Sequence, residues 1–356
     1  MRIALVGPPQ SGKSTLFAAV AEAGGSDVHI SRPDQPHLAV VKVPDGRVDW
    51  MADFEGSKKR TPAELEFLDL PGFDLSSEDG RDRCRAHWQA MGQSDMLVFV
   101  VAGFSDPTVA AYRGRVDAAG DVEELQAEML FADLERVMAR VEKLEAAIKK
   151  PTPRRDEQTH ELELMKRLLS ALEAEQPIAE AIHGEAESKL VRSFQFLTLK
   201  PVLVVVNCGE SEAAGTGPGE FSGLPRIQLS AKIEEELAQL PADDRQEFLA
   251  EMGLSDPARD RLIRACYERL DLISFLTAGP AESRAWSIPA GSDAVAAAGA
   301  VHTDMARGFI RAEVVTFEDL RAAGSYKAAK AAGKTRVEGK SYVVQDGDVI
   351  LFRFNV

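Results

Sequence analysis

The chain has 356 residues, of which 45% are hydrophobic and 28% charged, and its formal net charge is −15. This length and apolar content are enough for more than one buried core, so we expect two or three domains. The acidic balance disfavours unspecific attraction to nucleic acid phosphates, and we expect no DNA specificity.

The N-terminus and the cysteines indicate the compartment. The opening MRIALVG lacks the long apolar stretch and the cleavage site of a secretory signal. No apolar run approaches the ~20 residues of a membrane-spanning helix. Cys84, Cys208 and Cys266 are widely separated, without the close pairs of a zinc site or a disulfide framework. We therefore expect a cytoplasmic protein with reduced thiols and no membrane partner.

Short apolar runs bounded by turn residues recur in the first and third parts of the chain. They occupy residues 3–6, 38–43, 65–68, 96–101, 202–206 and 227–229. Runs of this length are typical of buried strands. The sequence therefore predicts an α/β fold with a mostly parallel sheet.

Between the fourth and fifth runs the pattern becomes helical. Apolar residues are separated by alternating intervals of four and three among charged residues, namely Leu130, Leu134, Val137, Val141, Leu144 and Ile148. This spacing is a heptad seam. After Pro151 and Pro153 a second apolar series follows, at Leu162, Met165, Leu169 and Leu172. We predict an antiparallel helical coiled-coil hairpin that packs within the chain rather than against a second copy.

The strongest motif is GPPQSGKS, residues 7–14, which fits the phosphate-binding pattern GxxxxGK[ST]. It lies between an apolar strand and a helix expected to begin near Lys13. Gly7 and Gly12 let the backbone turn its amides toward a phosphate, and the helix N-terminus adds its positive dipole end. Lys13 supplies a mobile charge to the β- and γ-oxygens, which makes it the predicted catalytic residue, and Ser14 is placed to bind magnesium.

A second motif, DLPG, occupies residues 69–72 at the end of an apolar run. A carboxylate that leaves a buried strand can hold magnesium through water, and a glycine amide can sense the γ-phosphate. Asp69 is therefore the second expected metal ligand, and Gly72 an expected phosphate contact.

Two further segments, VVVNCGE at 204–210 and LSAK at 229–232, follow in the order of a Ras-like nucleotide site. In GTPases the base-reading motif is NKxD, whose Asp accepts two guanine protons. Here Cys208 stands at the Lys position and Glu210 at the Asp position. A displaced carboxylate loses that discrimination, so the sequence favours ATP over GTP.

These motifs resemble the YchF subfamily of Obg-like P-loop ATPases, whose base motif is NxxE. The stretches 121–137 and 196–210 also resemble the family, as does the tail that includes AAGKTRVEGKSYVVQDGDVILFRFNV. The resemblance implies a Ras-like domain over 1–120 and 196–274 and the helical insertion over 121–195. It further implies a TGS domain of ubiquitin-like β-grasp form over 275–356.

The resemblance also implies Mg²⁺-dependent ATP hydrolysis and association with the ribosome or ribosomal RNA. Phosphate contacts carried over by position are Gln10, Ser11, Gly12, Lys13, Ser14 and Thr15. Base-region contacts are Asn207, Cys208, Glu210, Ser230 and Ala231. The implied magnesium ligands are Ser14 and Asp69.

Several positions depart from the family pattern. Pro33 stands where the first switch has a magnesium-binding Thr, and Gln10-Ser11 replaces an Asn-Val pair. DLPG replaces DIAG, and Phe73 follows it where Ras-type enzymes have a water-orienting Gln. No histidine lies between His87 and His160, so the family's loop histidine has no counterpart.

These departures leave two other hypotheses open. One is a degenerate relative that holds ATP and serves as a ribosome or RNA adaptor with negligible turnover. The other is a GTPase, as the wider Obg relationship suggests. A basic set in the tail is a candidate RNA contact or a solvated face, and consists of Lys327, Lys330, Lys334, Arg336 and Lys340.

Overall fold

The computed structural model describes residues 1–23, 34–149, 153–213, 219–254 and 256–355. The chain divides into two compact units. The first comprises Met1–Glu22, Asp27–Ala39 and Phe67–Ser255, and the second Ala23–Ser26, Val40–Glu66 and Asp256–Val356, each within the described ranges. None of the helices in those ranges has the length and apolar character needed to cross a membrane.

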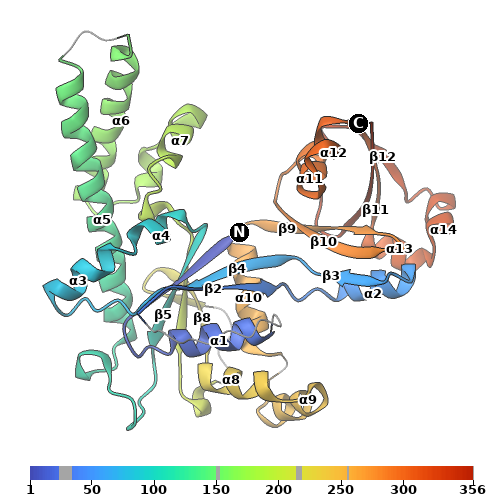
Figure 1. The fold of residues 1–356 in the computed structure, drawn as a ribbon, viewed down its shortest axis with the longest axis horizontal. Coiled ribbons are helices and arrows are strands. Elements are labelled where there is room, and N and C mark those ends of the chain that lie inside the picture. The colour runs from blue at the N-terminus through green and yellow to red at the C-terminus, as the bar shows by residue number, and fades with distance from the viewer. Residues whose placement is uncertain (24–33, 150–152, 214–218, 255, 356) are drawn as a thin grey trace. The chain divides into compact units, whose positions relative to one another are not determined.

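A seven-stranded sheet is the framework of the first unit (Figure 1). Its order is β2 (His37–Lys42), β4 (Glu64–Asp69), β1 (Arg2–Val6), β5 (Met96–Ala102), β6 (Val202–Asn207), β8 (Leu224–Leu229) and β7 (Gly219–Phe221). The pairs β1–β5, β5–β6 and β6–β8 are parallel, and only β7 runs antiparallel to β8 among these. The predicted mostly parallel α/β sheet is therefore confirmed.

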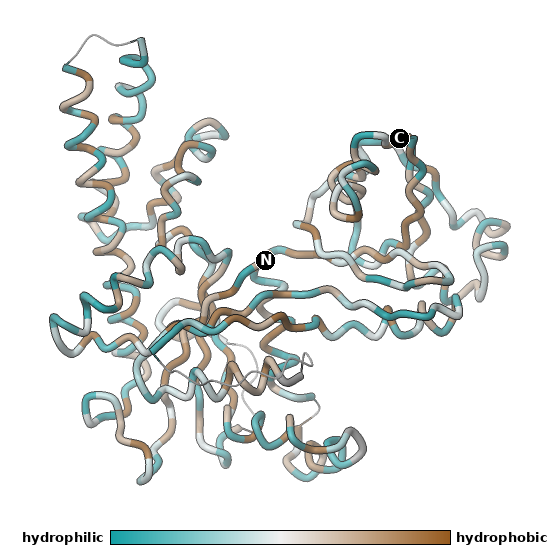
Figure 2. The backbone as a smooth tube through the Cα atoms, in the orientation of Figure 1, coloured by the Kyte–Doolittle hydropathy of each residue, from teal (hydrophilic) through white to brown (hydrophobic). Residues whose placement is uncertain are grey.

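The central strands are apolar because both faces of the sheet are covered. Every residue of β6 is buried, as are all but the last of β5, and Figure 2 shows these strands as hydrophobic segments. The short helices of this unit are α1 (Lys13–Ala23), α3 (Glu78–Arg85), α4 (Trp88–Gln93), α7 (Gly184–Arg192), α8 (Ala231–Gln239) and α9 (Ala242–Glu251). Because these strands are buried along their length, the polar residues that could bind a ligand lie where the strands end.

The predicted helical hairpin is formed by α5 (Ala118–Ala147) and α6 (Arg155–Glu173), which Figure 1 shows side by side. The seam of α5 packs with the apolar series of α6 in one cluster, so it is covered within the chain as predicted. Arg140 and Glu161 add a two-pronged ion pair with distances of 2.7 and 2.8 Å.

Asp133 fixes the hairpin to the strand that carries the base motif. Its carboxylate is fully buried and accepts hydrogen bonds from the backbone amides of Leu197 at 3.0 Å and Thr198 at 2.8 Å. Burial raises the pKa of this carboxyl, and the hydrogen bonds oppose the rise. Since Leu197 and Thr198 lie in the short turn shortly before β6, Asp133 anchors α5 to the segment that leads into this strand.

The second unit is built on a mixed six-stranded sheet. Its order is β12 (Arg336–Glu338), β11 (Phe309–Thr316), β13 (Asp348–Phe354), β9 (Leu272–Ala278), β10 (Glu282–Pro289) and β3 (Lys59–Thr61). The helices are α2 (Gly46–Glu55), α10 (Ala258–Arg269), α11 (Ala294–Val301), α12 (Thr303–Arg307), α13 (Phe317–Ala323) and α14 (Tyr326–Ala331). The antiparallel β9–β10 hairpin and the antiparallel β11–β13 pair meet through a parallel β9–β13 contact, the arrangement of a TGS-like terminal domain.

Residues 40–66, expected within the nucleotide-binding domain, group with the C-terminal residues, although residues 40–42 and 64–66 also belong to β2 and β4 of the seven-stranded sheet. Strand β3 pairs in parallel with β10. Trp50 stacks on Phe54 at 4.8 Å between ring centroids and meets Phe317 edge-on at 5.2 Å. Sequence order hides this arrangement because Phe317 lies more than 260 residues after Trp50.

Candidate nucleotide site

The loop after β1 has the backbone geometry of a phosphate cradle. Gly12 adopts φ +83°, and a Cβ atom there would lie 2.0 Å from the side-chain nitrogen of Asn207. Gln10 also has a positive φ of 62°, which is rare for a residue with a side chain. Helix α1 begins at Lys13, as expected, so the loop amides precede a helix N-terminus.

Lys13 and Ser14 at the start of α1 and Asp69 at the end of β4 form one polar group, in which Lys13 and Asp69 are buried and Ser14 is partly buried. The ammonium of Lys13 lies 2.6 Å from one carboxylate oxygen of Asp69 and also donates to the carbonyl of Leu70. The Ser14 hydroxyl donates to the other Asp69 oxygen at 2.8 Å. Burial lowers the pKa of Lys13, and the Asp69 charge opposes that shift.

The DLPG loop is held against the P-loop by backbone hydrogen bonds. Phe73 donates from its amide to the carbonyl of Gly7 at 2.9 Å, and Leu70 donates to Leu5 at 3.3 Å. The Phe73 side chain is only 3% exposed and belongs to the core of the first unit. Phe73 therefore presents no polar group to a water molecule.

Two adjoining cavities share Gln10, Gly12 and Thr15, so together they form one elongated site. The phosphate cavity, of about 820 Å³, is lined by Pro8, Pro9, Gln10, Ser11, Gly12, Lys13, Ser14, Thr15, Asp34, Pro71, Gly72, Asp74, Gly80, Arg83, Cys84, Ala86 and His87. The base cavity, of about 710 Å³, lies beside β6 and β8 and includes Asn207, Cys208, Glu210, Ser230 and Ala231. Volumes of this size suit a nucleotide-sized ligand.

Asn207 acts as a brace between the two cavities. Its side-chain nitrogen donates to the Ser11 carbonyl at 3.0 Å, and its oxygen accepts the Ala231 amide at 2.9 Å. The residue is 5% exposed. Asn207 thus joins the phosphate loop to the LSAK turn rather than leaving its amide free for a base.

The two altered positions of the base motif lie in different surroundings. Cys208 is 3% exposed and packs in a hydrophobic cluster that includes Ile233 and Leu237. Burial raises the pKa of its thiol. Glu210 is exposed, and its carboxylate pairs with Lys232 at 2.6 Å. Glu210 therefore offers carboxylate oxygens at the rim of the base cavity.

The structure brings the residues expected at the phosphates and at the base into these two cavities. Pro33, the altered switch position, lies outside the described residues. Asp74, Arg83 and His87 line the phosphate side and were not predicted from the sequence. Phe104, Asp106 and Val109 on the base side were likewise not predicted, whereas Lys232 is the last residue of the predicted LSAK segment. The unpredicted residues have no motif spacing relative to the P-loop, so only the chain's folding reveals them.

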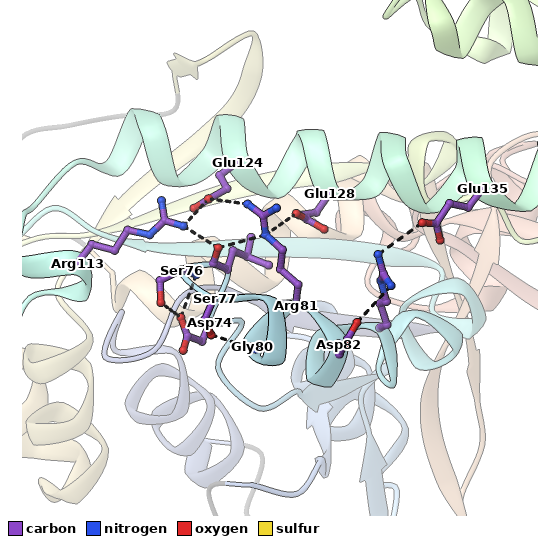
Figure 3. A network of polar contacts seen from close by, with 12 residues as sticks. Asp74, Ser76, Ser77, Gly80, Arg81, Asp82, Arg113, Glu124, Glu128 and Glu135 are labelled. Atoms are coloured by element: carbon purple, nitrogen blue, oxygen red, sulfur yellow. Dashed lines mark hydrogen bonds and ion pairs between the residues drawn. The ribbon is translucent and has the colours of Figure 1, made fainter.

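A polar network links the loop after DLPG to α5 (Figure 3). Arg81 lies 3.4 Å from Glu128 and 4.0 Å from Glu124, and its Nε donates to the Leu75 carbonyl at 3.2 Å. Arg113 reaches both Glu124 and Leu75 at 2.7 Å. The segment that follows Gly72 is therefore connected to the base of the helical hairpin.

The basic set of the tail is exposed but partly neutralised. Lys334 lies 3.2 Å from Asp319, and Arg336 lies 3.8 Å from Glu338. Such surface pairs are worth little energetically and can be exchanged for phosphate contacts. The set stays a candidate RNA contact.

The chain is similar to known proteins along its whole length. The YchF-GTPase C-terminal model, described as a protein of unknown function, matches residues 272–355, and the 50S ribosome-binding GTPase model matches residues 2–139. The chain is 38% identical to the ribosome-binding ATPase YchF of Bacillus subtilis over 99% of this chain and 98% of the relative. It is 33% identical to Obg-like ATPase 1 of Oryza sativa subsp. japonica, covering 100% and 92%. The solved YchF GTPase of Schizosaccharomyces pombe superposes with a TM-score of 0.82 at 26% identity, covering 99% and 97%.

Proposed function

The chain belongs to the YchF family, and from that premise we propose that it is a Mg²⁺-dependent, ATP-hydrolysing switch protein that associates with ribosomes. The observation that carries this proposal is the polar group of Lys13, Ser14 and Asp69 at the P-loop. A cation, a hydroxyl and a carboxylate in mutual contact are the parts that triphosphate hydrolysis needs there.

The donor set at this point fits magnesium. The Ser14 hydroxyl and the Asp69 carboxylate are hard oxygen ligands that already lie 2.8 Å apart. Within the described ranges, no cluster of three or more His, Cys, Asp or Glu side chains offers another metal site. When bound, the ion would neutralise charge on the β- and γ-phosphate oxygens.

The other groups of the phosphate cavity have separable tasks. Lys13 would move from Asp69 toward the phosphate oxygens, and because it is 4% exposed its charge acts where water screens little. Gly72, whose backbone packs against Pro9, would offer its amide to the γ-phosphate. Binding and charge stabilisation therefore rest on residues whose backbone positions the fold already fixes.

The base cavity supports ATP as the preferred substrate. Glu210 is one methylene longer than the Asp of a guanine-reading motif, and its carboxylate is engaged by Lys232. The buried Cys208 thiol supplies no cation to cover a purine ring. A site that no longer pairs with both guanine protons loses its selectivity for guanine. The relatives carry both names, ATPase and GTPase.

Ribosome association comes from the relatives, whose names describe ribosome-binding ATPases. The network from Leu75 through Arg81 to Glu128 supports the switch part of the proposal. Ordering of the DLPG loop by a γ-phosphate would bias this network and hence the hairpin base.

A second candidate is an adaptor that holds ATP without turnover. The buried Phe73 side chain favours it, because the position that orients water in Ras-type enzymes has no polar group. The two candidates make different predictions for phosphate release.

The test is ATP and GTP binding by calorimetry with magnesium, followed in the same preparation by phosphate release with and without purified ribosomes. ATP-selective binding with release that ribosomes stimulate supports the switch ATPase. Tighter GTP binding contradicts the base argument. ATP binding without release in either condition supports the adaptor. A repeat in EDTA tests the magnesium requirement.

A further inference from the structure

His87 is the one imidazole that lines the phosphate cavity in the described part of the chain. It lies at the junction of α3 and α4, where it precedes Trp88 as the N-terminal cap position of α4. Its backbone is fixed at both sides, since its amide donates to the Cys84 carbonyl at 2.9 Å and its carbonyl accepts the Met91 amide at 3.0 Å. The ring therefore projects from a defined backbone position.

The ring rests on the aromatic residue that follows DLPG. The ring centroids of His87 and Phe73 are 6.1 Å apart, with a tilt of 52° between their planes. Phe73 is buried in the core, so it gives the imidazole a fixed aromatic neighbour. The side chain that replaces a water-orienting residue in sequence thus supports a polar ring in space.

The ring nitrogens of His87 are available to bind a ligand or water. Neither ring nitrogen has a hydrogen-bond partner among the residues that the structure describes, and the ring is half-buried. Burial, and after it the positive charge of Lys13, lowers the pKa of His87. At neutral pH the ring is then uncharged and keeps one nitrogen lone pair as an acceptor.

The other residues that line the phosphate cavity determine which ligand His87 can reach. The cavity is lined by the P-loop with Lys13, by Gly72, and by residues of α3 and of the turn that leads to His87. A γ-phosphate held by Lys13 and Gly72 would therefore occupy the same cavity as the imidazole of His87.

We propose that His87 positions the water that attacks the γ-phosphate, in place of the missing polar side chain after DLPG. This rests on the proposed hydrolysis. The water oxygen forms a bond to the γ-phosphorus while the bond from that phosphorus to the bridging oxygen breaks, and its electron pair leaves with the nucleoside diphosphate. One water proton passes to the free imidazole nitrogen and from there to solvent, and inorganic phosphate is released.

The experiment compares the full chain with His87→Phe, His87→Ala and His87→Gln. Phe keeps an aromatic ring on Phe73 but has no acceptor, whereas Gln restores an acceptor without the ring. Thermal unfolding and ATP affinity are measured for each variant, then single-turnover phosphate release with magnesium, with and without ribosomes. If His87→Ala does not fold, the Phe and Gln variants decide.

We expect His87→Phe and His87→Ala to bind ATP as the wild type does and to release phosphate about a hundredfold more slowly. His87→Gln should stay within about tenfold of the wild type, since Gln serves as a water-orienting residue. Phosphate release at the wild-type rate in the Phe variant would overturn the role of His87 but leave the proposed hydrolysis standing. Absence of release from the wild type in every condition would overturn the proposed hydrolysis, and the assignment with it.

Discussion

The side-chain amide of Asn207 donates a hydrogen bond of 3.0 Å to the carbonyl of Ser11, a residue 196 positions earlier in the chain. The same side chain accepts the amide of Ala231. One buried residue therefore determines how the phosphate loop and the base-side turn are spaced. This connection explains why an Asn ends β6 even where the rest of the base motif has changed.

Asn207→Ala should weaken both binding and folding. It leaves the Ser11 carbonyl and the Ala231 amide buried without this partner, which costs about 1–3 kcal/mol. We expect a lower unfolding midpoint and ATP affinity reduced by at least about tenfold, measured by denaturant titration and calorimetry. Gln228→Ala is the control, because Gln228 on the neighbouring β8 bonds to Glu212 and not to the P-loop. Equal effects of both variants would contradict the conclusion that Asn207 holds the phosphate loop and the base-side turn together.

Lys13→Ala should remove triphosphate affinity. Charged hydrogen bonds contribute about 1.5–3 kcal/mol each, and Lys13 would make more than one to the phosphates, so we expect a loss of about a hundredfold or more. Calorimetry with ATP and magnesium measures it. Lys189→Ala, which removes an exposed lysine paired with Glu185 on α7, should leave affinity unchanged. Retained affinity in the Lys13 variant would refute the placement of the site.

Glu210→Asp should shift the base preference toward guanine. The shorter carboxylate matches the residue type that accepts two guanine protons in NKxD, so the ratio of GTP to ATP affinity should rise by about tenfold. Competition binding with the two nucleotides measures the ratio. Glu212→Asp is the matched control, since Glu212 lies two residues away and does not line the base cavity. An unchanged ratio would mean that base selection depends on other groups.

Arg81→Ala should uncouple the DLPG loop from α5 with little loss of stability. Arg81 is half exposed, so its ion pairs contribute at most about 1 kcal/mol. We expect hydrogen exchange in residues 118–129 to lose its response to ATP, while ATP affinity changes less than about threefold. Arg85→Ala, which removes an exposed pair with Glu135, serves as the control. A preserved response would remove the network from the switch mechanism.

The cysteines should resist alkylation in the folded protein. Burial raises the pKa of Cys84 to about 11 and raises the pKa values of Cys208 and Cys266 as well. The reactive thiolate is therefore scarce at pH 8, and its labelling by iodoacetamide should accelerate as the pH rises toward 11. The pKa values of these thiols in the folded protein exceed the unfolded value of about 8.5. The stability that the buried thiols contribute is therefore present below pH 8.5 and is lost as the pH rises from there through the folded pKa values.

Mass spectrometry of the labelled protein provides the measurement. Denatured protein should react at all three sites at pH 8, which serves as the control. Rapid stoichiometric labelling of the native chain at that pH would show that a thiol is accessible and activated, contrary to its burial.

Local patterns predicted much of this protein because they describe contiguous residues. Strand-length apolar runs, the seam from Leu130 to Ile148 and the GPPQSGKS loop each carry their physical cause within a few turns of chain. The sheet, the helical hairpin and the meeting of the P-loop with the base motif could be predicted from such patterns. The direction of the Cys208 side chain, into the cluster with Ile233, could not.

The sequence by itself determined which segments would be strands and helices and which residue types would meet a phosphate, because periodicity and motif spacing are local properties. Only the tertiary structure decided that residues 40–66 join the C-terminal unit through β3 and that His87 rests on Phe73 at the phosphate cavity. Such meetings depend on how whole elements pack, and packing selects partners by shape and burial across the chain rather than by their spacing in sequence.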